Sequence, residues 1–224
     1  LTDQGGTTNT GLPPKDSLQK IDSVPFPLTV GTWWKYQRVD TTITHLPNSY
    51  RPPVADSSIE IITVVGKTKL TDSVQAALLQ VKNLTSGRTD TSFAFYYRSN
   101  FIVSQYKSTD LSPYAKDYFL RAFDIRFRLP LTEGAYIIVS YDSIYIKKDT
   151  VVTVLNKQFL HCIFTHEFYP DFQGAFNYRY GSDSFLGNNI GFLYWRAYYE
   201  SGSHYGNSTE GWYVRRIMDY YIAP

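Results

Sequence analysis

The sequence predicts an all-β protein: an antiparallel sandwich, or an open or half barrel, of about a dozen strands. Three observations favour this class. Apolar and polar residues alternate with a period of two in many segments, as they do on strands with one covered face. Aromatic residues make up 17% of the 224 residues, 20 of them tyrosine, and such rings suit a pleated, half-buried surface. Short turns rich in Gly, Asn, Asp and Ser separate the segments, which indicates antiparallel pairing.

Composition and charge narrow the class of protein further. Hydrophobic residues make up 43% of the chain and charged residues only 19%, which excludes a disordered chain. The net charge is +2 and the basic residues are scattered, so nucleic acid is not expected as a partner. There is no apolar run of about 18 residues, and no transmembrane helix is expected. The single cysteine, Cys162, cannot form a disulfide within the chain.

The first 25 residues differ in composition from the rest of the chain. Residues 1–25 mix Gly, Thr, Asp and Pro, and they are expected to form a flexible N-terminal tether. Residues 26–224 are then a single β-domain. Met218 is the only methionine, so we expect a removed segment upstream of Leu1. The tether is either the linker of a lipid-anchored secreted protein or a frayed terminus without a role.

Strands are expected wherever the period of two is sustained. The clearest case is "FDIRFRL" at 123–129, where apolar residues alternate with Asp124, Arg126 and Arg128. That pattern indicates a strand with one covered face. Before it we expect strands at 32–39, 59–65, 74–84, 92–98 and 101–107. After it we expect strands at 135–146, 150–155, 158–169, 176–180, 191–200 and 211–222.

One helix is expected among the strands. In "SPYAKDYFLRAF", Ser112 is a candidate N-cap, and Pro113 occupies the first helical position, where its missing N–H is harmless. The sequence therefore predicts one short helix at about residues 113–121.

A five-residue motif occurs twice, as "PLTVG" at 27–31 and "PLTEG" at 130–134. The order of strands and turns after each copy is similar, which suggests two similar halves, 26–128 and 129–224. The alternative is one convenient turn that is used twice. In either case the two copies are expected at equivalent strand starts, with the glycine in a backbone conformation that other residues rarely adopt.

Several segments resemble a known family. The segments "FPLTVGTWWKYQ", "KQFLHCIFTHEF", "NNIGFLYWRAYY" and "WYVRRIMDYYI" are similar to segments of secreted lipoproteins common in Bacteroidetes. The resemblance covers most of the chain after residue 25. It implies an export signal and a lipid-modified cysteine just upstream of Leu1, which would anchor the domain to an envelope membrane, in the periplasm or at the cell surface. It implies no particular activity.

One segment, "HCIFTHE", contains residue types that bind metals. On a strand, however, His161 and Glu167 share one face while Cys162 and His166 share the other, so the four side chains cannot converge. A core-facing row is expected instead, with a hydrogen-bonded histidine at its edge: Leu160, Cys162, Phe164, His166 and Phe168. We therefore expect no metal site and no cofactor, and a cysteine too buried to act as a nucleophile.

No catalytic motif is found in the sequence. The segment "GSDSFLG" has the wrong spacing for the strained turn that presents a nucleophilic serine. The carboxylates available for glycoside hydrolysis show no spacing that selects a pair: Asp124, Asp142, Glu167, Asp171 and Glu200. The sequence thus identifies no catalytic residue and favours a non-enzymatic protein, with a hydrolase as the remaining alternative.

Clusters of aromatic residues are the best functional lead. Because side chains alternate along a strand, some rings must point outward or into a cavity, where they could stack on a sugar or close over an apolar ligand. The candidate ligand-binding residues are Trp34, Tyr36, Tyr194, Trp195, Tyr198 and Trp212. The alternative is cross-strand pairing that only stabilises a wide sheet.

Two kinds of function follow. The first is an envelope lipoprotein that binds a glycan or a lipid through its aromatic face. Coplanar exposed rings beside polar groups would indicate a glycan, and a closed apolar cavity would indicate a lipid. The second is a structural or assembly module that docks on another envelope protein through a flat apolar patch. Membrane contact is expected only through the removed N-terminal lipid anchor.

Overall fold

The computed structural model of the chain describes residues 26–46, 49–71, 74–97, 100–104, 125–128, 131, 133–139, 142–172, 176–203 and 208–224. In chain order these residues form β1 (Trp33–Leu46), β2 (Ser49–Thr71), β3 (Val74–Asn83), β4 (Thr89–Tyr97), β5 (Asn100–Ser104), β6 (Ile125–Arg128), β7 (Gly134–Val139), β8 (Asp142–Val154), β9 (Lys157–Phe172), β10 (Phe176–Gly187), β11 (Gly191–Ser203) and β12 (Ser208–Tyr221). The predicted all-β class is confirmed. Within these residues no helix is long and apolar enough to cross a membrane. The tether expected at 1–25 and the helix expected at 113–121 lie outside the described residues.

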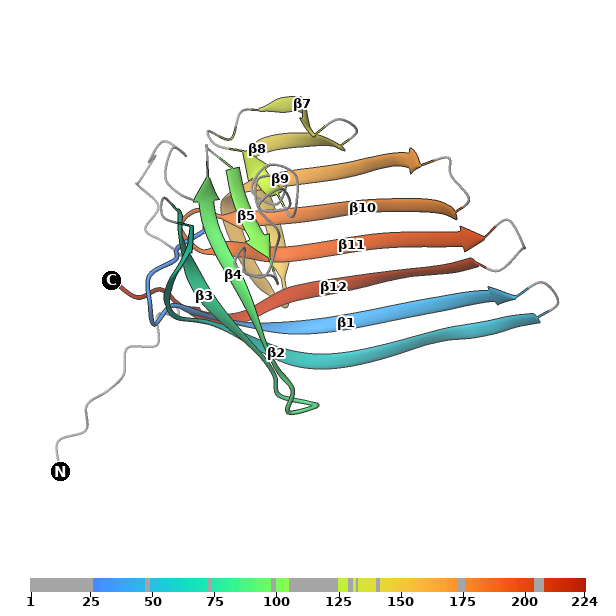
Figure 1. The fold of residues 1–224 in the computed structure, drawn as a ribbon, viewed down its shortest axis with the longest axis horizontal. Coiled ribbons are helices and arrows are strands. Elements are labelled where there is room, and N and C mark those ends of the chain that lie inside the picture. The colour runs from blue at the N-terminus through green and yellow to red at the C-terminus, as the bar shows by residue number, and fades with distance from the viewer. Residues whose placement is uncertain are drawn as a thin grey trace.

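All twelve strands belong to one antiparallel sheet, in the order β6-β5-β4-β3-β2-β1-β12-β11-β10-β9-β8-β7. The first and last strands of the chain, β1 and β12, pair at its centre. The sheet is strongly curled, so that β3, β4 and β5 lie in front of β10, β11 and β12 (Figure 1). The edge strands β6 and β7 come into contact. The curl gives the sheet an inner face, towards β3 to β5, and an outer face.

The core fills the inner face at one end of the sheet. Fully buried side chains from strands distant in sequence meet there, among them Trp34 of β1, Val64 of β2, Leu193 of β11 and Ile217 of β12. Leu79 of β3 belongs to the same cluster, so the curled part of the sheet packs on the central strands. Apolar residues at every second position of these strands supply the buried face, as the period of two predicts.

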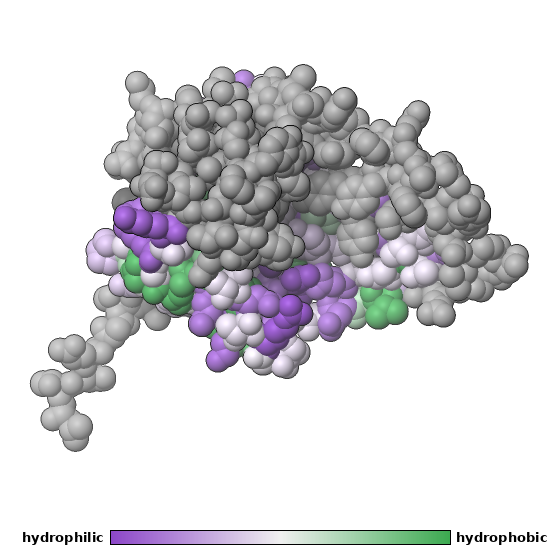
Figure 2. Space-filling model, viewed as in Figure 1, coloured by the Kyte–Doolittle hydropathy of each residue, from purple (hydrophilic) through white to green (hydrophobic). Residues whose placement is uncertain are grey.

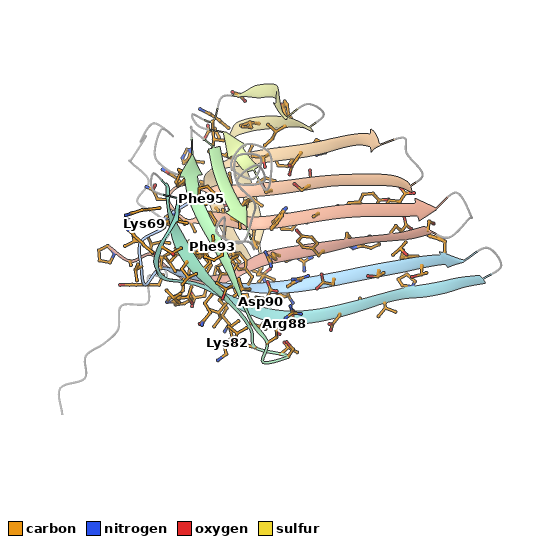
Figure 3. All side chains as sticks on the ribbon, in the orientation of Figure 1. Lys69, Lys82, Arg88, Asp90, Phe93 and Phe95 are labelled. Atoms are coloured by element: carbon orange, nitrogen blue, oxygen red, sulfur yellow. The ribbon has the colours of Figure 1, made fainter. Side chains whose placement is uncertain are left out.

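The strand β4 is buried on both faces. Ala94 belongs to the core on the inner face. Phe93 and Phe95 are on the opposite face of the strand and are also buried (Figure 3). Burial on both sides explains why the "SFAFYY" segment is a nearly continuous apolar run rather than an alternating one.

Several strand boundaries differ from the sequence prediction: β1 and β10 each end seven residues later than predicted, and two further segments differ as follows. Residues 135–146, predicted as one strand, are divided between β7 and β8, which form a hairpin. The strand predicted at 59–65 starts much earlier, at Ser49, and includes Pro52 and Pro53. The prolines are tolerated because the register with β1 shifts opposite them and because β3 pairs only with the later part of β2. Pairing with β1, rather than local propensity, decides the structure of this segment.

The repeated motif has the same backbone feature in both copies. Gly31 has a φ of 94° just before β1, and Gly134 has a φ of 120° at the start of β7. The glycine conformation predicted for both copies is therefore confirmed. The leucines of the two copies, Leu28 and Leu131, both pack in or against the core. Duplication of 26–128 and 129–224 stays a prediction.

A further glycine, Gly191, allows Phe26 to close the core. Gly191 has a φ of 99°, and a Cβ added there would lie 2.8 Å from the ring of Phe26. That ring packs on Trp34 and Phe192. We expect Gly191→Ala to lower the free energy of unfolding by about 2–4 kcal/mol, because the new methyl group adds backbone strain and a collision. Thermal unfolding measures the loss.

Gly87 provides the control for this prediction. It has a φ of 74°, but a Cβ added there meets nothing within 4 Å. Gly87→Ala therefore adds only the backbone strain, about 1 kcal/mol. Equal losses of stability for Gly87→Ala and Gly191→Ala would contradict the role assigned to Phe26.

Candidate functional site

The inner face carries charged side chains next to the core. Alternation along β1 places Arg38 on the same face as the buried Tyr36. The pairing register sets Arg38 opposite Arg215 of β12, and Tyr36 opposite Glu60 of β2. Three strands that are distant in sequence thus bring these groups together. We call Arg38, Asp40, Glu60 and Arg215 the charged cluster.

Glu60 is the centre of the charged cluster. Its side chain is 4% exposed, and its two oxygens accept hydrogen bonds from Arg38 Nη1 at 3.0 Å and from Arg215 Nε at 2.9 Å. Asp40 accepts two further hydrogen bonds from Arg38, at 2.7 and 2.8 Å. A buried carboxylate is tolerated here because each of its oxygens meets a guanidinium group.

The same contacts decide the charge state of Arg38. Burial acts to lower the pKa of Arg38, but hydrogen bonds and attraction from Asp40 and Glu60 outweigh it and hold the pKa above its usual value. The guanidinium group therefore remains charged. With two positive and two negative groups, the charged cluster is neutral as a whole.

An aromatic group, formed by Phe192, Trp195 and Tyr213, borders the charged cluster. The guanidinium carbon of Arg215 lies 5.6 Å from the Trp195 ring centre, and that of Arg38 lies 5.4 Å from the Tyr213 ring centre. Trp195 and Tyr213 meet edge to face, with centroids 5.2 Å apart and planes at 77°. Phe192 stacks on Trp195 at 5.5 Å. These contacts fix the orientation of both guanidinium groups.

Arg215 has hydrogen-bond donors that the described residues do not use. Its Nε binds Glu60, but no acceptor among the residues that the structure describes binds its Nη1 or Nη2. The side chain is only 20% exposed, so its hydration is limited. A guanidinium group held in this way can bind a carboxylate or a phosphate through two parallel hydrogen bonds.

Two of the predicted ligand-binding residues, Trp34 and Tyr36, belong to the core. They are 0% and 3% exposed. The indole Nε1 of Trp34 donates to the carbonyl of Ile190, and the hydroxyl of Tyr36 donates to the carbonyl of Phe192 at 2.9 Å. Burial raises the pKa of Tyr36 above its usual value. Both side chains thus join β1 to the turn between β10 and β11, and neither reaches the surface in this structure.

Three other predicted residues, Tyr194, Tyr198 and Trp212, lie on the outer face by their register, and Tyr194 also packs against the core. Tyr198 stands directly opposite Trp212 in the pairing of β11 with β12. Its hydroxyl lies 3.3 Å from a carboxylate oxygen of Glu200 and 3.4 Å from one of Glu210. Burial raises the pKa of Tyr198, and the two carboxylates raise it further. The six predicted residues therefore do not share one surface. Two are in the core, Trp195 borders the charged cluster on the inner face, and the other three are on the outer face.

Sequence reasoning missed the charged cluster, although one signal was present. Glu60 is in phase with Ile62, which packs against the core, so the alternation of β2 places a carboxylate at a core position. Such a residue indicates a buried, paired charge. Its partners could not be identified from the sequence, because Arg38 and Arg215 are 22 and 155 residues away along the chain.

The core-facing row predicted on β9 is wrong. Leu160 and His166 are exposed, whereas Cys162 and Ile163 are both buried. The reason is a β-bulge at His161, which has a φ of 52° where the register with β8 shifts, so that the alternation changes phase. Cys162 is buried as predicted, and burial raises the pKa of its thiol to about 11, which disfavours the reactive thiolate.

The two histidines of this strand have carboxylate partners rather than each other. His161 pairs with Asp149, and His166 Nδ1 lies 2.8 Å from Asp183. Among the residues that the structure describes, no group of three or more His, Cys, Asp and Glu side chains is placed to hold a metal ion.

Several solved structures align with the chain, among them lipovitellin and two bacterial proteins. No family model matches the chain, and neither does any curated protein. Lipovitellin, studied for its lipid–protein interactions, aligns with 88% of the chain at 9% identity and a TM-score of 0.45, and the chain spans 26% of its length. A protein designated as exported, with a YmcC-like fold, from Bacteroides fragilis aligns with 87% of the chain and 98% of its own length (12% identity, TM-score 0.36). A protein designated as a lipoprotein from Parabacteroides distasonis has the same coverage (13% identity, TM-score 0.34). At these scores the alignments establish neither a family nor a function.

Proposed function

We propose that the chain is an exported, non-enzymatic envelope protein whose inner sheet face binds a lipid-class amphiphile with an acidic head group. The observation that carries this proposal is Arg215. Its guanidinium group is held by Glu60 and Trp195, is largely buried, and keeps two terminal amino groups that no described residue binds. A carboxylate or phosphate would complete the hydrogen bonding of this group.

The aromatic group supports the apolar part of such a ligand. Phe192, Trp195 and Tyr213 are half-buried and form a continuous path from the charged cluster to the core, where Phe192 touches Phe26. The inner face of the sheet thus changes from charged, at the charged cluster, to apolar, at the core, over a short distance. An amphiphile has the same change of polarity along its length.

The ring geometry favours a lipid over a glycan. A sugar needs an open, flat ring face, but Trp195 is covered by Phe192 on one side and approached by Arg215. Tyr213 meets Trp195 at 77° rather than in its plane. A flexible acyl chain can follow such a surface, whereas coplanar stacking on a sugar ring is not available there.

The outer face supports a second candidate function, an assembly module that docks on another envelope protein. The observation in its favour is the pair formed by Tyr198 and Trp212, with Tyr194 on the same strand. Aromatic residues of this kind are enriched in the centres of protein interfaces. A lipid anchor upstream of the tether, with the domain in the periplasm or at the cell surface, is part of both candidate functions.

Arg215→Lys tests the ligand site. Lysine keeps a positive charge beside Glu60 but lacks the planar pair of terminal amino groups. We expect dodecanoate to bind the 224-residue chain, and its affinity to fall about tenfold or more in the variant, because a hydrogen bond to a charged group contributes about 1.5–3 kcal/mol. Isothermal titration calorimetry measures both affinities.

Arg216→Lys is the matched control. Arg216 is the next residue of β12 and points to the outer face. Its replacement by lysine should therefore leave the affinity for dodecanoate unchanged. Dodecanol has the same chain without the charge and should bind more weakly than dodecanoate. Equal losses in the two lysine variants, or no binding of dodecanoate and dodecyl phosphate, would refute the proposal. Binding of oligosaccharides in their place would favour a glycan site.

A further inference from the structure

The hairpin of β8 and β9 ends in an unusual turn. Leu155 and Asn156 connect the paired residues Val154 and Lys157. The φ angles are 48° at Leu155 and 68° at Asn156, so both central residues are in the left-handed region. Two-residue hairpin turns of this kind favour Asn, Asp and Gly, and leucine is disfavoured there. The turn nevertheless has a leucine, and its side chain is 42% exposed.

The side of the hairpin that faces away from the core is also partly apolar. Val151 of β8 and Leu160 of β9 are exposed there. The other side of the hairpin packs on the protein, through Val152 and Phe159, which lie opposite each other and contact the core. The outward apolar residues therefore have no part in holding the hairpin to the sheet.

The hairpin is fixed at its base and at its tip. At the base, His161 pairs with Asp149, and both residues have positive φ. At the tip, Lys157 Nζ donates a hydrogen bond to the carbonyl of Met218 at 3.0 Å. These contacts hold the turn in one position against β12, so its exposed leucine is presented by a supported element.

The hairpin carries more lysines than acidic residues, with Lys157 beside the turn and Lys147 and Lys148 near its base. Residues 147–161 contain Lys147, Lys148 and Lys157 against a single aspartate, which is already paired with a histidine. Tyr221, the last residue of β12, is exposed and stands three residues after Met218, whose carbonyl binds Lys157. In the view of Figure 2 the hydrophobic surface of the described residues is confined to small patches between hydrophilic ones. Exposed apolar residues on an element that also carries several lysines are typical of surfaces that insert shallowly into anionic lipid.

We propose that this hairpin tip docks the protein on the surface of an anionic lipid bilayer. Leu155 inserts at the level of the upper acyl chains, Val151 and Leu160 approach the head groups, and Lys147 and Lys148 attract anionic lipids from the base of the hairpin. A protein partner fits less well, because Thr153 and Gln158 stand between the apolar residues and interrupt the patch. The proposal concerns the outer surface and does not depend on the ligand site of the inner face.

Leu155→Asn is the variant that tests this proposal. We expect the full chain to co-sediment with vesicles of phosphatidylcholine and phosphatidylglycerol, and the partition coefficient to fall about tenfold in the variant, because one leucine side chain no longer leaves water. Asparagine is favoured in this turn, so the melting temperature should stay the same or rise. A loss of binding without a loss of stability separates docking from folding.

Leu84→Asn is the matched control. Leu84 is 45% exposed at the turn between β3 and β4, and its replacement should leave vesicle binding unchanged. Equal losses in the Leu84 and Leu155 variants, or no binding by the unmodified chain, would overturn the proposal. The proposal would also be overturned if Arg215→Lys abolished vesicle binding while Leu155→Asn retained vesicle binding. A third contradicting result would be a change in oligomeric state, measured by sedimentation velocity, as the only effect of Leu155→Asn.

Discussion

Replacing Trp34 by alanine is expected to lower the free energy of unfolding by about 4 kcal/mol. Trp34 is fully buried, its ring packs 4.7 Å from that of Phe26, and its indole N–H is bound by the carbonyl of Ile190. The substitution leaves a large cavity and deprives that carbonyl of its donor. In a chain of 224 residues the melting temperature should fall by roughly 8–16 °C, which circular dichroism or calorimetry measures.

The neighbouring tryptophan provides the control. Trp33 points to the outer face of β1 and is half-buried, so Trp33→Ala should cost roughly 1–2 kcal/mol. Trp34→Phe keeps most of the apolar area but lacks the N–H donor, and its loss should be intermediate. Equal losses for the two alanine variants would contradict the assignment of Trp33 and Trp34 to opposite faces.

The second large effect is expected at the centre of the charged cluster. Glu60→Gln keeps the size of the side chain but removes the charge that two guanidinium groups share. We expect the free energy of unfolding to fall by about 3 kcal/mol, because Arg38 and Arg215 would then face each other without the buried carboxylate between them. The melting temperature should fall by roughly 6–12 °C. Chemical denaturation of the same variant measures the free energy directly.

An exposed ion pair provides the comparison for this prediction. Arg88 and Asp90, near the turn between β3 and β4, are paired at 3.0 Å, but their side chains are exposed (Figure 3). Asp90→Asn should therefore cost less than about 1 kcal/mol. In a double-mutant cycle, Glu60→Gln combined with Arg215→Met should lose less than the sum of the two single changes. Additive losses would show that the carboxylate and Arg215 do not interact.

The strand positions were predictable because the signal for them is local. The strands β3, β11 and β12 alternate over several residues, and each lies close to its predicted range. The prediction was wrong where a local irregularity interrupts the period. The bulge at His161 reverses the faces of β9, and the start of β2 passes through Pro52 and Pro53, which carry no strand signal.

The candidate site was much less predictable than the strands. The sequence pointed to aromatic residues, and the structure places Trp34 and Tyr36 in the core. Of the others, Trp195 borders the charged cluster, while Tyr198 and Trp212 face the opposite side. An aromatic residue has the same local pattern in each of these places, because core packing, cross-strand pairing and ligand contact all use alternate positions of a strand.

The amino-acid sequence alone was enough to predict the all-β class, the approximate positions of most strands, and the conformation of the glycines in the repeated motif. These features depend on composition, on a period of two residues and on the backbone freedom of glycine, all of which are local properties. The three-dimensional structure was needed to show which strands lie side by side and which face of each strand is the inner one. The charged cluster exists because β2, β1 and β12 pair in one register, which sets Glu60 between Arg38 and Arg215. That register depends on contacts between residues far apart along the chain, and no single segment encodes it.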